Sequence, residues 1–325
     1  MTRILARRLI QYGLLLFFAL VINFMLPRLA PGGPLQTIAG ADVGLLTPDE
    51  LAQLRRDYGL DRPLYEQFGD YVGQTVSGDL GYSYRQGRPV SEILFARIPW
   101  TLLLAGSGLL IATLIGILFG AYAAYHRGSR RDVSLTGAFV FLQSLPAFWI
   151  GMVFIAIFAT RLRLLPTFGA QSIVPPEAFV DQLFDIAIHL VMPLTVLVLA
   201  SIPHIFLTTR YAMLGVLQED FIDTAYAKGL RRGVIVLRHA LRNALLPVLT
   251  VFALHLGAVV SGATVIETVF SYPGVGRLMY ESVVARDYPV LQAGFLVITL
   301  SIVAANLLAD LLYPVLDPRV RVGGR

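Results

Sequence analysis

Cysteine is absent from the 325 residues of this sequence, and lysine occurs once, at Lys228. The lack of cysteine excludes a disulfide framework and any thiolate metal or redox site. Charged residues are also scarce, at 14% of the chain against roughly 25% in ordinary soluble domains. Hydrophobic residues account for 56%. Because a soluble fold of this size could not bury so much apolar surface, we expect a membrane protein.

Several motifs of soluble enzymes are missing as well. A Walker-type phosphate loop ends in Gly-Lys followed by Ser or Thr, but Lys228 precedes Gly229 instead. No two of the five histidines stand at the i, i+4 spacing of a helical zinc site. The spans also lack a nucleophile–base pair, so we do not expect an enzyme, a bound metal or a cofactor on this chain.

Long apolar segments dominate what is present. They lie at about 9–28, 101–125, 134–160, 187–209, 245–266 and 289–313. Each is close to the ~20 residues that a helix needs to cross ~30 Å of hydrocarbon. The runs are continuous rather than alternating, which favours helices over barrel strands. The sequence therefore predicts an all-α integral membrane protein with about six transmembrane helices.

The basic residues indicate which ends of these spans face the cytoplasm. Arginines gather in the N-terminal segment, at 127–131, at 210–242 and in the C-terminal tail, which fall on one side of the predicted spans. Cytoplasmic loops carry such an excess. We therefore expect a multi-pass protein of the bacterial cytoplasmic (inner) membrane with both termini in the cytoplasm. Topology explains the net charge of +5, so no nucleic-acid partner is needed.

The first external segment, 29–100, is long enough to hold structure of its own. Thr47 and Glu50 have the spacing of a capping box, and Gly59 can end the helix that this box begins. A second short helix is expected after Pro63. We predict a small helical lid rather than an independent domain.

The loop between the fourth and fifth spans contains a short amphipathic run. Acidic residues open it, which suits the positive end of a helix dipole, and Gly229 can end it in a left-handed conformation. Its apolar residues are expected on one helical face: Phe221, Ile222, Ala225 and Tyr226. Such a helix could lie on the membrane or pack on its neighbours, or it could dock a cytoplasmic partner.

Residues 223–230 and 238–247 resemble the coupling loop of binding-protein-dependent ABC permeases, closest to the dipeptide/oligopeptide/nickel branch. Further motifs of that family follow in the same order, at 29–34, 78–83 with 87–90, 144–149 with 165–169, and 270–277 with 286–290. Gly33 departs from the acidic residue usual in the family, although Pro-Gly-Gly-Pro resembles a peptide-importer sub-branch. The likeness covers nearly the whole chain.

This resemblance implies a type I ABC importer-like permease with a small external helical lid. It divides the chain into a cytoplasmic segment and first span at 1–28, an external loop at 29–100, and a permease core at 101–325 that includes the coupling loop 210–245. The partners would be a second homologous permease subunit, two ATP-binding subunits holding ATP and Mg, and an external binding protein. The residues implied to enter the ATPase are Glu219, Asp220, Phe221, Ile222, Asp223, Thr224, Ala225, Tyr226, Ala227, Lys228 and Gly229.

The resemblance implies import of di- or oligopeptides or similar small solutes. Polar residues in or near the spans are candidates for the substrate pathway: Gln143, His204, His255, Ser261 and Asn306. They could equally serve as hydrogen-bonding contacts between helices. An ion-coupled secondary transporter remains an alternative, although coupling carboxylates deep in the membrane are not evident. The same ABC architecture carrying nickel chelates is a second alternative.

Overall fold

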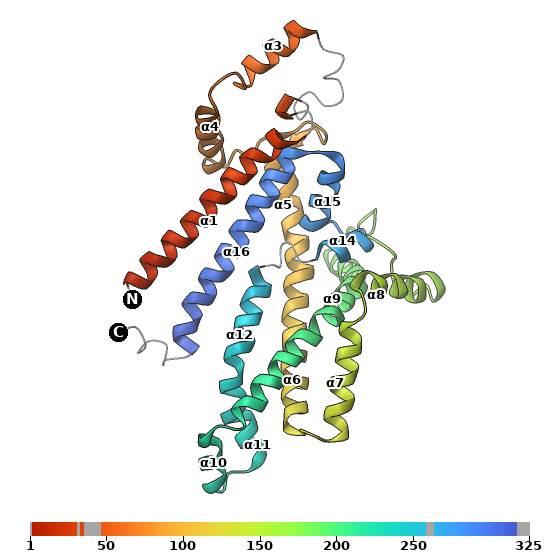
Figure 1. Cartoon of the computed structure of the whole chain (residues 1–325). Coiled ribbons are helices and arrows are strands. Elements are labelled where there is room, and N and C mark those ends of the chain that lie inside the picture. The colour runs from red at the N-terminus through yellow and green to blue at the C-terminus, as the bar shows by residue number, and fades with distance from the viewer. Residues whose placement is uncertain (1, 31–32, 36–46, 258–262, 317–325) are drawn as a thin grey trace. The chain divides into compact units, whose positions relative to one another are not determined.

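The computed structural model describes residues 2–30, 33–35, 47–257 and 263–316. The chain forms two compact units (Figure 1). The first combines residues 1–99 with 274–303, and the second combines 100–273 with 304–325. The predicted division at residues 28 and 100 stays a prediction.

The first unit holds mostly helices and one short antiparallel ribbon. Its elements are α1 (Thr2–Leu29), α3 (Pro48–Asp57), α4 (Leu64–Val76), β1 (Tyr82–Ser83), β2 (Arg88–Pro89), the start of α5 (Val90–Thr101), α15 (Val275–Ala285) and the start of α16 (Tyr288–Leu316). Residues 47–89 are called the lid below.

Within its described residues, the regular elements of the second unit are all helices. After the end of α5 it contains a π-helical turn at Leu102–Gly106, α6 (Ser107–Tyr125), α7 (Arg130–Gln143), α8 (Ala147–Phe154) with a π-helical continuation at Ile155–Arg161, α9 (Phe179–Val216), α10 (Asp220–Ala227), α11 (Arg232–Val234), a π-helical turn at Ile235–Ala240, α12 (Leu241–Gly257) and α14 (Thr264–Val269).

Among the described residues, four helices are long and apolar enough to cross a membrane, at Ile10–Leu29, Val90–Tyr125, Phe179–Val216 and Tyr288–Leu307. A bent pair, Arg130–Gln143 and Ala147–Arg161, makes a fifth candidate if it is one span. These agree with five of the six predicted segments. The remaining predicted span, 245–266, overlaps α12 up to Gly257. It then includes residues 258–262, which lie outside the described part of the chain. The prediction of a helical membrane protein is confirmed.

The predicted span at 134–160 is divided between two helices. The two helices of this segment are bent by 92° at a short break around Pro146. Pro146 adopts an extended ψ of 134° as the N-cap of α8, and it has no N–H to continue α7. A proline also disfavours helical geometry in the residue before it. The break therefore follows from local backbone chemistry.

The lid begins as the sequence predicts. The Thr47 side chain accepts from the Glu50 backbone N–H, and the Glu50 carboxylate accepts from the Thr47 backbone N–H at 2.7 Å, which completes the capping box. Gly59 has a φ of +61° where α3 ends, and α4 follows Pro63. Two reciprocal hydrogen bonds join α1 to α16 within the same unit. The Asn23 side chain donates to the Gln292 carbonyl at 3.2 Å, and the Gln292 side chain donates to the Asn23 carbonyl at 2.7 Å.

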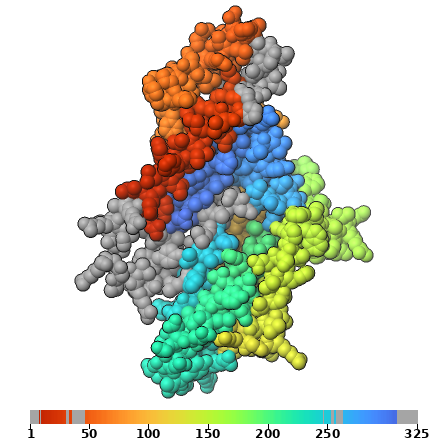
Figure 2. All heavy atoms as spheres, in the orientation of Figure 1, coloured from red at the N-terminus to blue at the C-terminus, as the bar shows by residue number. Residues whose placement is uncertain are grey.

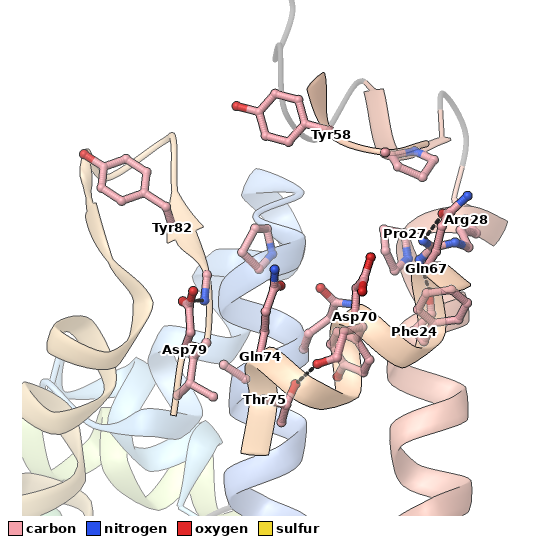
Figure 3. A pocket seen from close by; sticks show the side chains of 18 of the residues that line it. Phe24, Pro27, Arg28, Tyr58, Gln67, Asp70, Gln74, Thr75, Asp79 and Tyr82 are labelled. Atoms are coloured by element: carbon pink, nitrogen blue, oxygen red, sulfur yellow. Dashed lines mark hydrogen bonds between the residues drawn. The ribbon is translucent and has the colours of Figure 1, made fainter. Parts of the chain in front are cut away.

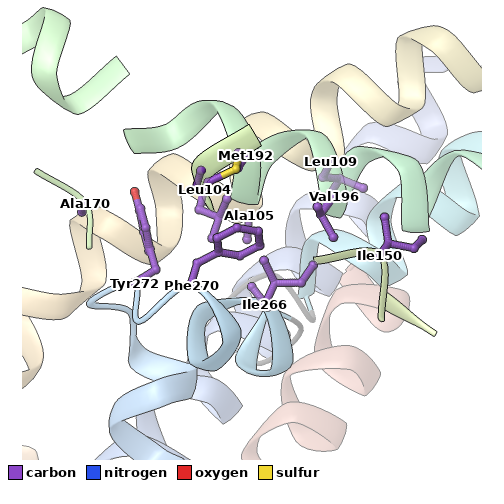
Figure 4. Packing of buried hydrophobic residues seen from close by; sticks show 12 residues of the cluster. Leu104, Ala105, Leu109, Ile150, Ala170, Met192, Val196, Ile266, Phe270 and Tyr272 are labelled. Carbon is purple, nitrogen blue, oxygen red and sulfur yellow. The ribbon is translucent and has the colours of Figure 1, made fainter. Parts of the chain in front are cut away.

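The second unit is organised around the close packing of α6 against α9. Glycines stand where the two helices approach: a Cβ on Gly120 would lie 2.7 Å from Thr209 Cβ, and one on Gly116 would lie 2.8 Å from Ile205 Cβ. Small residues permit such close backbone contact between membrane helices. A separate apolar cluster joins α9 to α14 and its flanking loop through buried residues that include Met192, Val196, Ile266, Phe270 and Tyr272 (Figure 4).

Candidate functional site

The short helix α10 is built by local signals at both of its ends. Asp220 and Asp223 lie in its first turn, where their charge complements the helix dipole. At the other end Gly229 has a φ of +74°. The Leu230 N–H donates to the Ala225 carbonyl and the Gly229 N–H to the Tyr226 carbonyl, at 3.3 and 2.9 Å. These two bonds form a Schellman motif, so the glycine stop predicted from the sequence is present.

One face of α10 is fixed to the second unit. Ile222 is 1% exposed and Ala225 6%. They pack in one apolar cluster with Met213 of α9, Ile235 of the following π-helical turn and Ala124 of α6. Burial of this face fixes the position of α10 on its unit, next to the C-terminal end of α9 (Figure 1).

The four residues predicted on one helical face differ in burial. Phe221 and Tyr226 are 42% and 45% exposed, whereas Ile222 and Ala225 are buried. With ~3.6 residues per turn, the two aromatic residues lie about 70° to either side of the buried pair. The helix therefore packs on its unit through Ile222 and Ala225 and leaves its two aromatic side chains exposed.

The surface around these rings is also apolar. Leu230, Val234 and Leu237 are 37%, 41% and 65% exposed on the segment that follows α10. Figure 2 shows this part of the chain, coloured teal, forming a projecting end of its unit. We call Phe221, Tyr226, Leu230, Val234 and Leu237 the α10 surface. A projecting apolar surface with aromatic residues is typical of a protein-docking site.

An ion pair braces the end of α9 from which α10 emerges. Arg210 donates to both Asp132 oxygens, from Nε at 2.7 Å and from Nη2 at 2.9 Å. Asp132 is 3% exposed and also accepts from the Gly128 N–H at 3.0 Å. This pair was not predicted from the sequence, where Arg210 indicated only topology. An acid two residues into a helix that follows an arginine-rich turn was the available signal.

A second contact ties the segment after α10 to α6. Arg232 Nη2 donates to the Tyr125 carbonyl at 2.8 Å, and its guanidinium lies 4.7 Å from the centroid of the Tyr125 ring. Together with the Asp132–Arg210 pair, this contact links α6, α7, α9 and α11 at one end of the second unit. A force applied to α10 would therefore be transmitted to several helices.

The predicted pathway residues are only partly brought together. The His204 and His255 rings stack at a centroid distance of 5.4 Å between α9 and α12. His204 is exposed and His255 is half-buried. Gln143 is the exposed last residue of α7, Asn306 is half-buried in α16, and Ser261 lies outside the described residues. Their role in a pathway stays a prediction.

Within the described residues, no three His, Asp or Glu side chains are grouped so as to hold a metal ion. One acid, Asp185, does connect polar side chains, since it accepts from Ser172 Oγ at 2.6 Å and lies 3.3 Å from His189 Nδ1. Asp185 thus lies between Ser172 and His189. In a hydrolase triad the histidine lies between the serine and the acid, so these residues do not form one. The contacts instead anchor the loop before α9.

These features define a polytopic helical membrane protein with a short, rigidly seated helix outside its spans. The chain belongs to the family of binding-protein-dependent transport system inner membrane components. The model of that family matches residues 116–322, and a second model, for the N-terminal part of the same membrane components, matches residues 1–105. The chain is thus a non-catalytic, multi-pass inner-membrane permease component.

Curated relatives match over nearly their whole length. The dipeptide transport system permease protein DppB of Escherichia coli K12 is 38% identical over 93% of both chains. The oligopeptide transport system permease protein AppB of Bacillus subtilis is 35% identical over 98% of both. The di/tripeptide transport system permease protein DppB of Pseudomonas aeruginosa is 38% identical over 99% of both.

A solved structure supports the fold. A chain from the MetNI methionine ABC transporter aligns with a TM-score of 0.56 and 14% sequence identity, and the alignment covers 69% of this chain and 96% of that one. At this identity the likeness shows the fold alone. The predicted ABC importer-like permease fold is therefore confirmed.

Proposed function

We propose that this chain is a permease subunit of a peptide importer and that the α10 surface docks an ATPase subunit. Membership of a binding-protein-dependent family implies a binding protein and ATPase subunits as partners. The observation that carries the docking proposal is the division of α10 into a buried pair, Ile222 and Ala225, and an exposed aromatic pair, Phe221 and Tyr226. A rigidly seated helix with outward aromatic rings suits a cleft on a partner.

The mechanism follows from how α10 is attached. Its buried face belongs to the same apolar cluster as α6 and α9, and the Asp132–Arg210 pair joins α7 to α9. A movement of the ATPase cleft would therefore turn these helices together rather than bend α10 alone. ATP and Mg would be held by the ATPase subunits, and a second homologous permease would supply the other half of the pathway.

Peptide cargo is proposed from the relatives, which are named as dipeptide, di/tripeptide and oligopeptide permeases. The His204–His255 pair is the polar feature within the spans that we assign to the pathway, together with Gln143, Ser261 and Asn306. The nitrogen lone pairs of an imidazole lie in its ring plane, and the two ring planes are inclined by only 27°. This arrangement suits separate hydrogen bonds to a peptide better than shared coordination of one metal ion. Competition of labelled dipeptide uptake by unlabelled dipeptide, but not by a nickel chelate, would separate the two cargo classes.

Co-purification tests the docking. The double variant Phe221→Ala/Tyr226→Ala should insert in the membrane but lose the ATPase subunits during purification in mild detergent. Val133→Ala is the matched control, because Val133 is an apolar residue of α7 that is 66% exposed and lies outside the α10 surface. Unchanged co-purification of the double variant would contradict the proposed docking surface. Substrate movement by the lone chain without ATP would favour the secondary-transporter alternative.

A further inference from the structure

A cavity of about 420 Å³ lies inside the first unit, among α1, the lid and the start of α16. Nothing in the proposed docking or pathway uses it. Its volume falls within the ~300–1,000 Å³ usual for small-molecule sites. Figure 3 shows its side chains converging from these elements, with Asp79, Gln74 and Asp70 along one wall and Phe24, Arg28 and Gln67 along another.

The walls are held in place by contacts that bridge distant parts of the chain. Phe24 is 2% exposed and lies edge-on to Phe68 of the lid at a centroid distance of 5.2 Å. Between the lining residues Tyr82 and Tyr84, the buried Ser83 hydroxyl donates to Asp287 at 2.5 Å. The ribbon of the lid is thus fastened to the residue before α16. The cavity is a built feature of the fold rather than a loose gap.

Tyrosines form the rim. The Tyr58 and Tyr84 hydroxyls share a hydrogen bond of 2.6 Å, and the Tyr82 and Tyr84 rings meet edge-to-face at 5.4 Å. The pKa of Tyr84 is raised to about 12, mainly by burial and to a smaller extent by the hydrogen bond with Tyr58. Tyr84 is therefore neutral at physiological pH. The rim offers aromatic surfaces and hydroxyl groups.

The charges of the lining favour a cation. Asp70 and Asp79 contribute two carboxylates, and Arg28 contributes the opposing positive charge. The Arg28 guanidinium already has partners, since it lies 3.5 Å from the Phe24 ring centroid and donates to Gln67 Oε1 at 2.5 Å. Asp70 is joined to Arg62 only by an exposed pair at 3.4 Å, and such pairs contribute little. Aromatic rings beside available carboxylates form the usual setting for an organic ammonium group.

We propose that this cavity binds the ammonium end of a transported peptide before the peptide enters the pathway. The inference rests on the proposed peptide-import function. Asp70 and Asp79 would balance the ammonium charge, Tyr82 would offer its ring, and the Tyr58–Tyr84 pair would bound the site. The permease would then hold its cargo by a group that every unblocked peptide carries, independent of side-chain identity.

Free and blocked dipeptides test the proposal. The assembled transporter, with its partner permease and ATPase subunits but without binding protein, is placed in lipid nanodiscs. Binding of Gly-Phe and of N-acetyl-Gly-Phe is then measured by calorimetry. The acetylated probe lacks the ammonium and should bind at least about tenfold more weakly than Gly-Phe. Equal affinity for the two probes, or no binding of Gly-Phe, would overturn the proposal.

Variants locate the site. Asp70→Asn/Asp79→Asn should weaken Gly-Phe binding about tenfold and remove the preference over the acetylated probe. The Gly81 N–H donates to the Asp79 carboxylate at 2.9 Å, and Asp79→Asn alone keeps an acceptor for this bond. This single variant should lose less affinity for Gly-Phe than the double variant does. It serves if the double variant fails to assemble. Tyr82→Leu should weaken binding of Gly-Phe more than that of the acetylated probe, because the ring contacts the ammonium.

Matched control residues lie on α4, the helix that carries Asp70, but outside the cavity. Glu66→Gln and Tyr65→Leu alter exposed residues of α4 that do not line it, and both should bind Gly-Phe as the unmodified transporter does. If the carboxylate variants bind Gly-Phe normally but lose affinity for the binding protein, the cavity is a socket for that protein and the proposal is wrong. Failure of the unmodified permease to assemble with ATPase subunits would instead count against the proposed function.

Discussion

Asp132 and Arg210 form a bidentate ion pair between α7 and α9, with both side chains largely buried at 4% and 15% exposure. The two residues are 78 positions apart in the sequence. Buried pairs of this kind add little net stability compared with well-packed apolar residues, but removal of one partner leaves a buried charge uncompensated. The pair therefore fixes how two helices meet near α10.

Loss of the arginine should be costly. Arg210→Ala should destabilise the chain by about 3–5 kcal/mol, because the Asp132 carboxylate would remain buried without its partner. The measurement is thermal or denaturant unfolding of the purified protein in detergent. Arg88→Ala, which breaks the exposed Arg88–Glu92 pair, is the control and should change stability by less than about 1 kcal/mol. Similar effects from both variants would contradict the bracing role of the pair.

Gly229 should be needed for its backbone conformation rather than for space. A Cβ there would meet no atom within 4 Å, but φ is +74°, and β-branched residues are strongly disfavoured in that region. Gly229→Val should abolish transport and leave membrane insertion intact, whereas Gly229→Asn should keep most transport. Gly215→Val is the control, because Gly215 also has open space and no positive φ. Normal transport by Gly229→Val would contradict a fixed coupling helix.

Local signals explain why this part of the structure was predictable. The Gly229 stop and the Thr47–Glu50 capping box each depend on a few neighbouring residues, and both are present. The Asp132–Arg210 pair depends on how two helices pack, which no local pattern states. The same holds for the exposed positions of Phe221 and Tyr226, since helical periodicity groups apolar residues but does not say which of them a neighbour covers.

The close α6–α9 contact should tolerate no added side chain. Gly120→Ala would place a Cβ 2.7 Å from Thr209 Cβ and 2.8 Å from the Phe206 carbonyl oxygen, so the helices must separate. We expect a destabilisation of about 1–3 kcal/mol, as for other overpacked sites. Gly137→Ala on α7 meets nothing within 4 Å and should be neutral or stabilising, because alanine favours helix more than glycine does. Equal unfolding midpoints for the two variants would show that α6 and α9 have room.

The proposed orientation can be tested in a chain that has no native cysteine. Asp49→Cys in the lid should react with a membrane-impermeant maleimide in spheroplasts. Lys228→Cys beside α10 should react only after the membrane is permeabilised. The cysteine-free parent gives the background. Labelling of position 228 in sealed cells would place the α10 surface outside the cytoplasm and exclude its docking to an ATPase.

The capping box should make the lid sensitive to acid. Hydrogen bonds from the Thr47 backbone N–H, and then from its hydroxyl, lower the pKa of the Glu50 carboxyl below its ordinary value of 4.5. A lowered folded-state pKa stabilises the helix above the unfolded-state value, and this contribution is lost as pH falls through the folded-state pKa. Protection of the α3 amides from hydrogen exchange, corrected for the intrinsic rate, should therefore decrease as pH falls below about 4.5. Glu50→Gln keeps the reciprocal bond without a titrating group, so its α3 protection should not change over that range. An identical acid response in this variant would assign the effect to other carboxyl groups.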